Sequence, residues 1–168
     1  NIYTNDFSHL VSLGQFSEDP KDVFFIGTNS ELYARYASIT MEQYDSLVEK
    51  VLREMKNSFS NSRLYYIPHG RDKNQKTKLL CAELGITYQK LDEAVELYFI
   101  RNNIYPEAII GFTSSALFNV KKMMPKVKAL NYFLDNKSAM YYIKNKETSE
   151  YYQCNDIALI NVGLEDLS

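Results

Sequence analysis

The chain of 168 residues has the length of one domain, and its 45% apolar and 24% charged residues, with 6 Gly and 4 Pro, are typical of a folded protein. This composition excludes collagen-like, low-complexity and disordered chains, and no apolar run approaches the roughly 18 residues of a membrane-spanning helix. The net charge of -2 argues against a dedicated nucleic-acid-binding domain, which is usually basic.

The chain begins with a connecting segment and a strand. Residues 1–20 mix polar side chains without a clear period and end in Ser-Glu-Asp-Pro, so we expect a linker there. Residues 21–28 form a short apolar run that Gly27 stops, as in a buried strand that leads into a loop. We expect one domain over residues 21–168. Because the chain opens with Asn-Ile-Tyr, we also expect it to be a piece of a longer protein.

A helix and a second strand follow. Thr40 and Gln43 have the spacing of a capping box, and apolar side chains recur at helical intervals over residues 41–55, which predicts a helix. Residues 63–67 favour a strand. Pro68 ends this strand because proline has no amide hydrogen to donate to the ladder.

The middle of the chain predicts two more helices. Residues 76–84 have the pattern of a short helix with Gly85 as its left-handed cap, and residues 86–88 make a brief extended step. Asp92 is expected to cap a further helix that runs through about Asn103.

The last third of the chain returns to strands. Residues 108–112 predict a strand, residues 113–117 begin a helix, and residues 127–134 and 156–162 predict two more strands. Strands that alternate with helices indicate right-handed β-α-β units. The expected fold is therefore α/β, with a Rossmann-like parallel sheet and helices on both faces.

The candidate binding loops lie at the carboxyl ends of strands, where open α/β sheets bind ligands. These loops open at Gly27, Pro68 and Phe112. After the last of them, Ser114 and Ser115 place hydroxyl groups beside the first free amides of a helix, which suits a phosphate. The alternative is that one of these serines only caps its helix.

A histidine and a glutamate extend this candidate site. His69 follows a strand end beside Arg71, where its imidazole can donate to an anionic oxygen and stabilise a departing phosphate. Glu96 lies within an apolar helix, where a carboxylate is costly unless it is paired or accepts from a group such as a ribose diol. In the alternative interpretation His69 is structural and Glu96 lies on an exposed helix stripe.

Three motifs occur in a fixed order along the chain: Tyr-Ile-Pro-His-Gly-Arg-Asp at 66–72, Val-Glu-Leu at 95–97 and Pro-Glu-Ala-Ile-Ile-Gly-Phe-Thr-Ser-Ser at 106–115. This order resembles the carboxyl-terminal, donor-binding half of bacterial sialyltransferases. The similar families are the lipooligosaccharide sialyltransferases of glycosyltransferase family 52 and the related capsular polysialyltransferases. Their motifs are a His-Pro pair after a strand, a glutamate on a helix and a Pro-x-x-x-x-Gly-x-x-Ser-Ser segment. The resemblance covers roughly residues 21–135.

The resemblance implies a metal-independent enzyme that transfers sialic acid from CMP-sialic acid to a glycan acceptor, such as lipooligosaccharide or capsule. His69, as the catalytic residue, would hold the phosphate together with Ser114 and Ser115. Glu96 would accept from the cytidine ribose, and Gly27 would belong to the same binding site. The chain would be one half of a GT-B enzyme whose remaining amino-terminal domain binds the acceptor, and a homodimer is also implied. No cofactor or metal is expected besides the donor substrate.

The sequence departs from the family pattern at two places. Gly70 stands where the family has proline, and we expect this glycine to loosen the backbone at His69. The Asp/Glu-Asp/Glu-Gly motif that supplies the general base is absent, because the acid pairs in segments 17–20 and 164–167 are not followed by glycine. The general base is therefore unassigned, and we expect the chain alone to be inactive.

A second class of function stays open. Residues 119–146 carry seven lysines against one acid, which suits a non-catalytic module that binds a polyanion or a protein partner. These lysines are also compatible with a peripheral position at the inner face of a bacterial membrane. Cys81 and Cys154 lack the spacing of a disulfide framework or a metal site, which favours a reduced, cytoplasmic protein.

Overall fold

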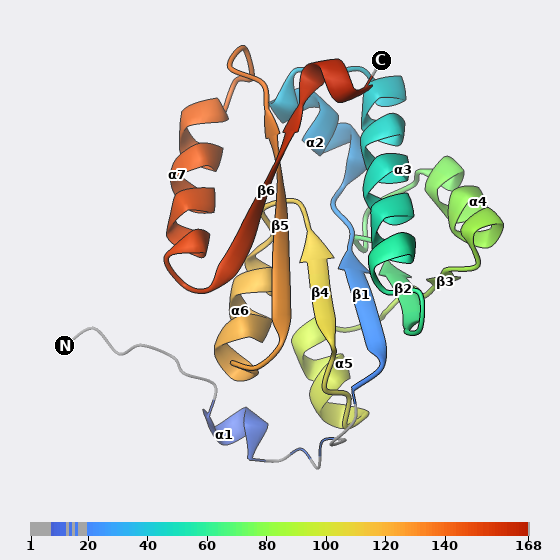
Figure 1. The fold of residues 1–168 in the computed structure, drawn as a ribbon, viewed down its shortest axis with the longest axis vertical. Coiled ribbons are helices and arrows are strands. Elements are labelled where there is room, and N and C mark those ends of the chain that lie inside the picture. The colour runs from blue at the N-terminus through green and yellow to red at the C-terminus, as the bar shows by residue number, and fades with distance from the viewer. Residues whose placement is uncertain (1–7, 13, 15, 17–19, 168) are drawn as a thin grey trace.

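The structure, a computed structural model, describes residues 8–12, 14, 16 and 20–167. Its strands are β1 (Asp22–Ile26), β2 (Arg63–Ile67), β3 (Thr87–Tyr88), β4 (Ala108–Gly111), β5 (Lys128–Asp135) and β6 (Ile157–Gly163). They form one all-parallel sheet with the order β3-β2-β1-β4-β5-β6 (Figure 1). This strand order confirms the Rossmann-like α/β fold that the sequence predicts.

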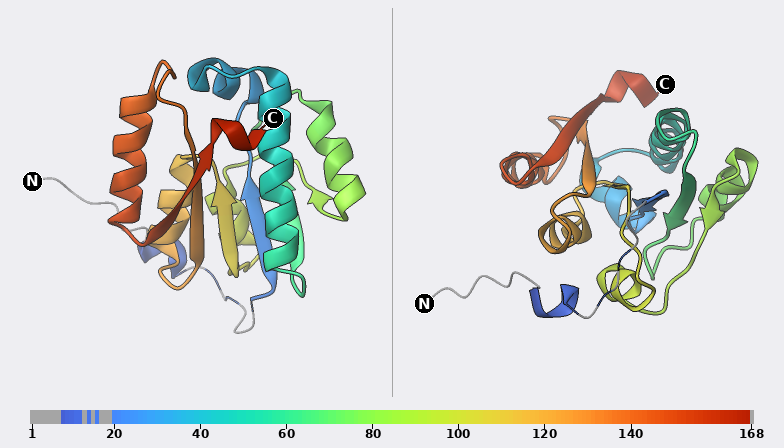
Figure 2. Two further views of the ribbon diagram at one scale, coloured as in Figure 1. Left: turned by 45° about the horizontal axis from the view of Figure 1, so that its top comes forward. Right: turned by 60° about the horizontal axis from the view of Figure 1, so that its bottom comes forward.

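Helices cover both faces of the sheet. They are α1 (Ser8–Val11), α2 (Ser30–Ala37), α3 (Met41–Ser58), α4 (Gln75–Leu84), α5 (Val95–Arg101), α6 (Ser115–Met123), α7 (Tyr142–Gln153) and the 3-10 helix η1 (Leu164–Leu167). Buried side chains of α2, α3 and α4 share one core cluster, and those of α5, α6 and α7 share another. In the left view of Figure 2, α3 lies in front of the sheet and α6 behind it.

The central strand β1 is buried on both faces. Val23 and Phe25 belong to the core cluster on the α3 side, whereas Phe24 and Ile26 belong to the cluster on the α6 side. A strand between two helix layers needs apolar side chains in every position, which explains the unbroken apolar run in the sequence.

The helix ends agree with most of the local sequence signals. Thr40 and Gln43 form a complete capping box at the start of α3. Gly85 ends α4 in the left-handed conformation, with a φ of 72°. The prediction for Asp92 is wrong, because α5 begins at Val95 and its N-cap residue makes no side-chain hydrogen bond.

The segment 1–20, expected to be a linker, lies largely outside the described residues. Within its described part, α1 forms a short helix, and Phe16 meets the ring of Tyr105 edge-on with 5.7 Å between the ring centroids. In the part of the chain that the structure describes, every helix is too short or too polar to cross a membrane.

The strand order places a switch point between β1 and β4. The chain leaves β1 for α2 on one face of the sheet and leaves β4 for α6 on the other face. The two loops therefore diverge and open a crevice at the carboxyl edge, where ligands bind in this fold.

Candidate functional site

A cleft of about 700 Å³ lies at the carboxyl edge of the sheet. Its walls come from the ends of β1 and β2, the segment from Lys90 to Glu96, and the start of α6. All five residues that the sequence singles out line this cleft: Gly27, His69, Glu96, Ser114 and Ser115. The structure thus brings together residues that are spread over three separate motifs.

The serine pair lies where β4 turns into α6. Ser114 is the N-cap residue of α6, and its Oγ accepts from the amide of Ala116 at 3.3 Å. Ser115 is the first residue of the helix, and its side chain is exposed. Helix capping and a ligand role are compatible, because a hydroxyl that accepts one hydrogen bond still has its own proton to donate.

A buried polar network holds the residue before this pair. Thr113 has a φ of 46°, a left-handed conformation that is unfavourable for a β-branched side chain. Its amide donates to Oδ1 of Asn131 at 2.6 Å, and Nδ2 of Asn131 donates to Ser149 Oγ at 3.0 Å. Asn131 is fully buried in β5 and Ser149 lies in α7, so two distant elements fix the turn that presents Ser114.

His69 is exposed at the cleft and is held in a tight turn. Its Nδ1 accepts from the amide of Arg71 at 3.2 Å, and its carbonyl accepts from the amide of Asp72 at 2.8 Å. The Asp72 carboxylate in turn accepts from the amide and hydroxyl of Ser30 at the start of α2. A neutral His69 in this position carries its proton on Nε2, which can donate to an anion.

The neighbouring Gly70 lies in an open part of the turn. Among the glycines that the structure describes, Gly85 alone has a positive φ. Gly70 therefore has a backbone conformation that other residues also adopt. A Cβ atom at Gly70 would meet nothing within 4 Å. The turn is hydrogen-bonded through both the carbonyl and the imidazole of His69, and the expected loosening of the backbone there stays a prediction.

Glu96 lies in the first turn of α5 and is half-buried at the cleft. Its Oε1 accepts from Nδ2 of Asn119 in α6 at 2.8 Å, so this carboxylate links the two helices that border the cleft. The carboxylate is therefore paired on one oxygen, and its other oxygen retains the capacity to accept from a ligand.

Gly27 has a packing role that needs no ligand. A Cβ atom there would lie 2.6 Å from Tyr66 Oη and 3.0 Å from the carbonyl of Ile67. The amide of Gly27 donates to that same carbonyl at 2.8 Å, so the two chain segments are in direct contact. Glycine lets the end of β1 approach β2 closely at the floor of the cleft.

The structure adds residues that the sequence analysis does not name. Lys90 lies at the cleft after β3, where its ammonium group can supply the positive charge that a phosphate needs. Its position follows the same rule as the other loops, because β3 also ends at the carboxyl edge. Arg71, by contrast, lines a separate depression with Asp72 and Lys73. Glu93 lines the cleft but pairs with Arg101 at 2.8 Å.

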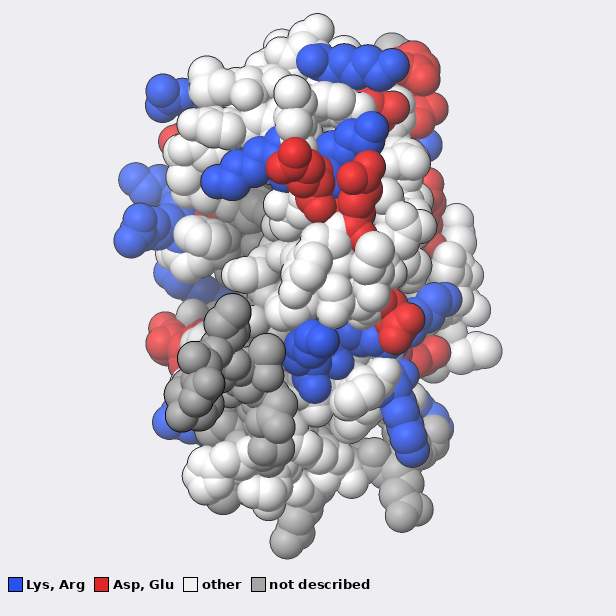
Figure 3. Space-filling view, turned by 90° about the vertical axis from the view of Figure 1, so that its left-hand side faces the viewer, with Lys and Arg blue, Asp and Glu red and all other residues white. Residues whose placement is uncertain are grey.

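Several lysines of residues 119–146 have partners close by in the structure. Lys121 donates to the backbone carbonyls that follow α6, and Lys128 lies over the ring of Phe59 with 5.1 Å to its centroid. Lys146 lies 3.9 Å from the carboxylate of Glu150 on the same helix. Figure 3 shows basic side chains in several separate groups on one face of the molecule, some of them beside acidic ones.

The fold and the cleft together define a Rossmann-like α/β protein with a ligand-sized cleft at the switch point of its sheet. A volume of about 700 Å³ falls within the usual range of pockets for small molecules and cofactors. Comparisons with protein-family models, with curated proteins and with solved structures find no match for this chain.

Proposed function

We propose that the chain is the donor-binding half of a GT-B sialyltransferase, which binds CMP-sialic acid and transfers its sialic acid to a glycan acceptor. The observation that carries the proposal is the convergence of three sequence motifs on one cleft. His69, Glu96 and the pair Ser114–Ser115 come from different elements of the fold and line the same cavity. The cleft thus contains the residues that the resemblance assigns to the donor, as expected for motifs that follow the strands of a parallel sheet.

The phosphate of the donor binds at the start of α6. The hydroxyls of Ser114 and Ser115 and the positive end of the helix dipole favour an anion there. Nε2 of His69 and the ammonium group of Lys90 supply further donors from the opposite wall.

The ribose binds against Glu96. One carboxylate oxygen is held by Asn119, and the other is directed to the vicinal hydroxyls of the nucleotide. A carboxylate that accepts from a diol discriminates ribose from deoxyribose, because loss of a hydroxyl leaves part of the acceptor without a partner.

Catalysis by this half of the enzyme consists of stabilising the leaving group. As the bond between the sialic acid and the phosphate breaks, negative charge grows on the phosphate, and donors already in place stabilise the transition state more than the ground state. In this proposal the acceptor and the general base belong to the other domain, and no metal takes part. His69 is the catalytic residue because it contacts the departing phosphate.

The substitution Ser114→Asp tests the phosphate site. Aspartate caps helices as well as serine does, so α6 should stay intact, but its charge repels a phosphate. We expect the variant to unfold at the same urea concentration as the parent and to bind CMP at least about tenfold more weakly by calorimetry. Ser60→Ala, at an exposed serine remote from the cleft, is the control. Equal CMP affinity in parent and Ser114→Asp would refute the assignment.

A matched pair of variants tests the ribose site. Asn119→Ala breaks the link between α5 and α6 and leaves the carboxylate, whereas Glu96→Gln keeps a partner for Asn119 and removes the charge. We expect Glu96→Gln to narrow the preference for CMP over 2′-deoxy-CMP, and Asn119→Ala to retain most of it. If both variants change the preference for CMP over 2′-deoxy-CMP to the same extent, Glu96 only links the two helices.

A further inference from the structure

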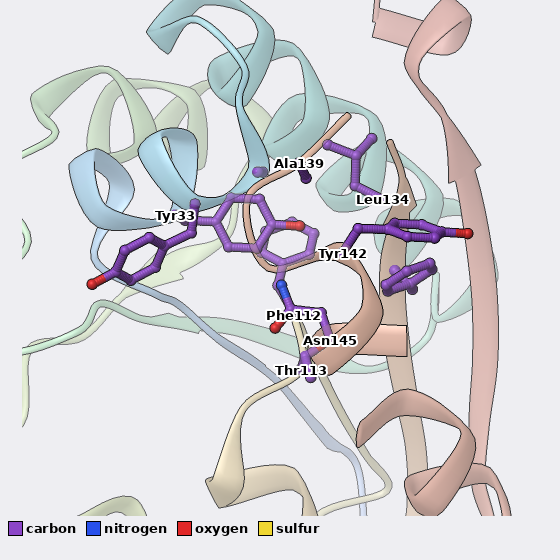
Figure 4. Close-up of a pocket in the computed structure, with 10 residues that line it drawn as sticks. Tyr33, Phe112, Thr113, Leu134, Ala139, Tyr142 and Asn145 are labelled. Atoms are coloured by element: carbon purple, nitrogen blue, oxygen red, sulfur yellow. The ribbon is translucent and has the colours of Figure 1, made fainter. Parts of the chain in front are cut away.

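A second pocket, of about 140 Å³, lies at the carboxyl edge on the side of α2 and α7 (Figure 4). Aromatic rings make most of its wall: Tyr33, Tyr36, Phe112, Phe133 and Tyr142. The pocket reaches into the core, because Phe112 and Phe133 are buried, and it meets solvent beside Tyr36, which is 39% exposed. It is distinct from the cleft, since none of its lining residues lines the cleft as well.

The size and the wall of this aromatic pocket suit one planar ring. An apolar cavity of about 150 Å³ binds benzene. At about 140 Å³ the pocket therefore has room for one six-membered ring and not for two. Aromatic rings pack favourably in offset or edge-to-face contacts. The rings of Phe133 and Tyr142 already meet at 5.8 Å between centroids on one side, and those of Tyr33 and Phe112 at 5.2 Å on another.

The aromatic pocket is electrically neutral. Among the described residues, no Lys, Arg, His, Asp or Glu lines it. Burial raises the pKa of Tyr33, and the hydrogen bond that Tyr142 donates to Asp135 raises the pKa of Tyr142, so both phenol groups stay protonated at pH 7. A charged ligand would lose its hydration there without gaining a counter-ion, which favours a neutral ligand.

The polar side of the pocket is the carboxamide of Asn145. This residue is half-buried in α7, and its side chain makes no hydrogen bond within the described part of the chain. One helical turn later, Ser149 lies 3.0 Å from Asn131 and 3.4 Å from Thr113, so Asn145 lies on the face of α7 that is turned toward this network. Figure 4 shows Asn145 beside Thr113, below Phe112. A carboxamide offers an acceptor oxygen and two donor protons, which together match a second carboxamide.

We propose that the aromatic pocket binds a small neutral molecule that consists of one aromatic ring and a carboxamide group. The ring lies among the side chains of Phe112, Phe133 and Tyr142, and the carboxamide exchanges two hydrogen bonds with Asn145. This site is independent of the proposed function, because it uses none of the residues that line the cleft.

Three probe molecules test the site: benzamide, benzoate and toluene. They share one ring and differ in its substituent, which is a neutral carboxamide, a charged carboxylate or a methyl group. We expect benzamide to bind the parent protein with a dissociation constant of about 1 mM, which is usual for a ligand of this size. Benzoate should not bind at the same concentrations. The NMR amide signals of Phe112, Thr113 and Asn145 report binding at this site, and those of Ser114 and Ser115 report binding at the cleft.

The substitution Asn145→Ala separates the ring from the carboxamide. It should weaken benzamide binding about tenfold, because two hydrogen bonds are lost, and leave toluene binding no weaker. The variant should fold, because the side chain makes no hydrogen bond within the described chain and alanine favours helices. Gln153→Ala removes an exposed amide from the same helix and is the control, which should match the parent with both probes.

A second variant tests the cavity itself. Ala139→Leu places a larger side chain at the wall of the pocket and should abolish the binding of both benzamide and toluene. Urea unfolding should show that this variant is folded.

Several results would overturn the assignment. It is wrong if benzamide does not bind, if it shifts the signals of Ser114 and Ser115 instead of those of the pocket, or if benzoate binds equally well. It is also wrong if Asn145→Ala keeps the full affinity for benzamide. CMP takes no part in these measurements, so their failure leaves the proposed function to its own tests.

Discussion

The turn before α6 should depend on one buried side chain, Asn131. Its carboxamide accepts from the amide of Thr113 at 2.6 Å and donates to Ser149 at 3.0 Å, and it is fully buried. The substitution Asn131→Ala leaves the Thr113 amide without its partner, which costs about 1–3 kcal/mol for a buried group. Relaxation of the left-handed Thr113 recovers part of this loss. We therefore expect a net destabilisation of about 2 kcal/mol.

Two measurements check this value. Urea unfolding reports the change in the free energy of unfolding. Amide hydrogen exchange followed by NMR reports the Thr113 amide directly, and about 2 kcal/mol corresponds to exchange about 30-fold faster. CMP affinity should also fall, because the turn no longer fixes Ser114.

The substitution Ser149→Ala is the control for this experiment. It removes the hydroxyl that contacts both Asn131 and the Thr113 side chain, but leaves the bond from the Thr113 amide to Asn131. We expect about 1 kcal/mol of destabilisation and no local increase in exchange at Thr113 beyond that of the whole protein. The reasoning is refuted if Asn131→Ala leaves Thr113 protected, or if Ser149→Ala exposes it equally.

Two further predictions concern packing and pH. Gly27→Ala should destabilise the protein by about 1–3 kcal/mol in urea, because its Cβ meets Tyr66 at 2.6 Å, whereas Gly70→Ala should be neutral or stabilising. Burial raises the pKa of Tyr44 from 10.0 to about 12. The unfolded chain therefore loses this proton first, so stability should hold below pH 10 and fall as the pH rises toward 12. Tyr44→Phe should make the free energy of unfolding fall less steeply between pH 10 and 12. An unchanged slope would contradict the raised pKa of Tyr44.

The elements with strong local signals could be predicted from the sequence. The helix α3 has both a capping box and a regular apolar stripe, and β1 has an unbroken apolar run between polar segments. The sequence analysis does not predict α2 and α7. The first ends at Ser38 in a left-handed conformation without glycine, and the second has no side-chain cap and a mixed surface rich in lysine and tyrosine. Tertiary packing stabilises such helices more than the helix propensity of their own residues does.

The candidate site could be predicted in part for a topological reason. The carboxyl ends of parallel strands meet at one edge, so residues after separate strands converge without any knowledge of side-chain contacts. Asn119 and Asn131 could not be assigned in this way, because their roles depend on partners in other elements. Asn131 did leave a signal, since it interrupts an otherwise apolar strand, where a polar side chain requires a buried partner.

The geometry of both pockets follows from the contact between β1 and β4. A Cβ atom at Gly111 in β4 would lie 2.9 Å from the carbonyl of Ile26 in β1. The two strands therefore stay close until their last residues and then separate abruptly, one toward α2 and the other toward α6. The turn at Thr113 lies at this point of separation, with the cleft that Ser114 lines on one side and a smaller pocket lined by Tyr33 and Tyr142 on the other (Figure 4). Because one strained residue forms the boundary, a change in its backbone should alter both pockets together.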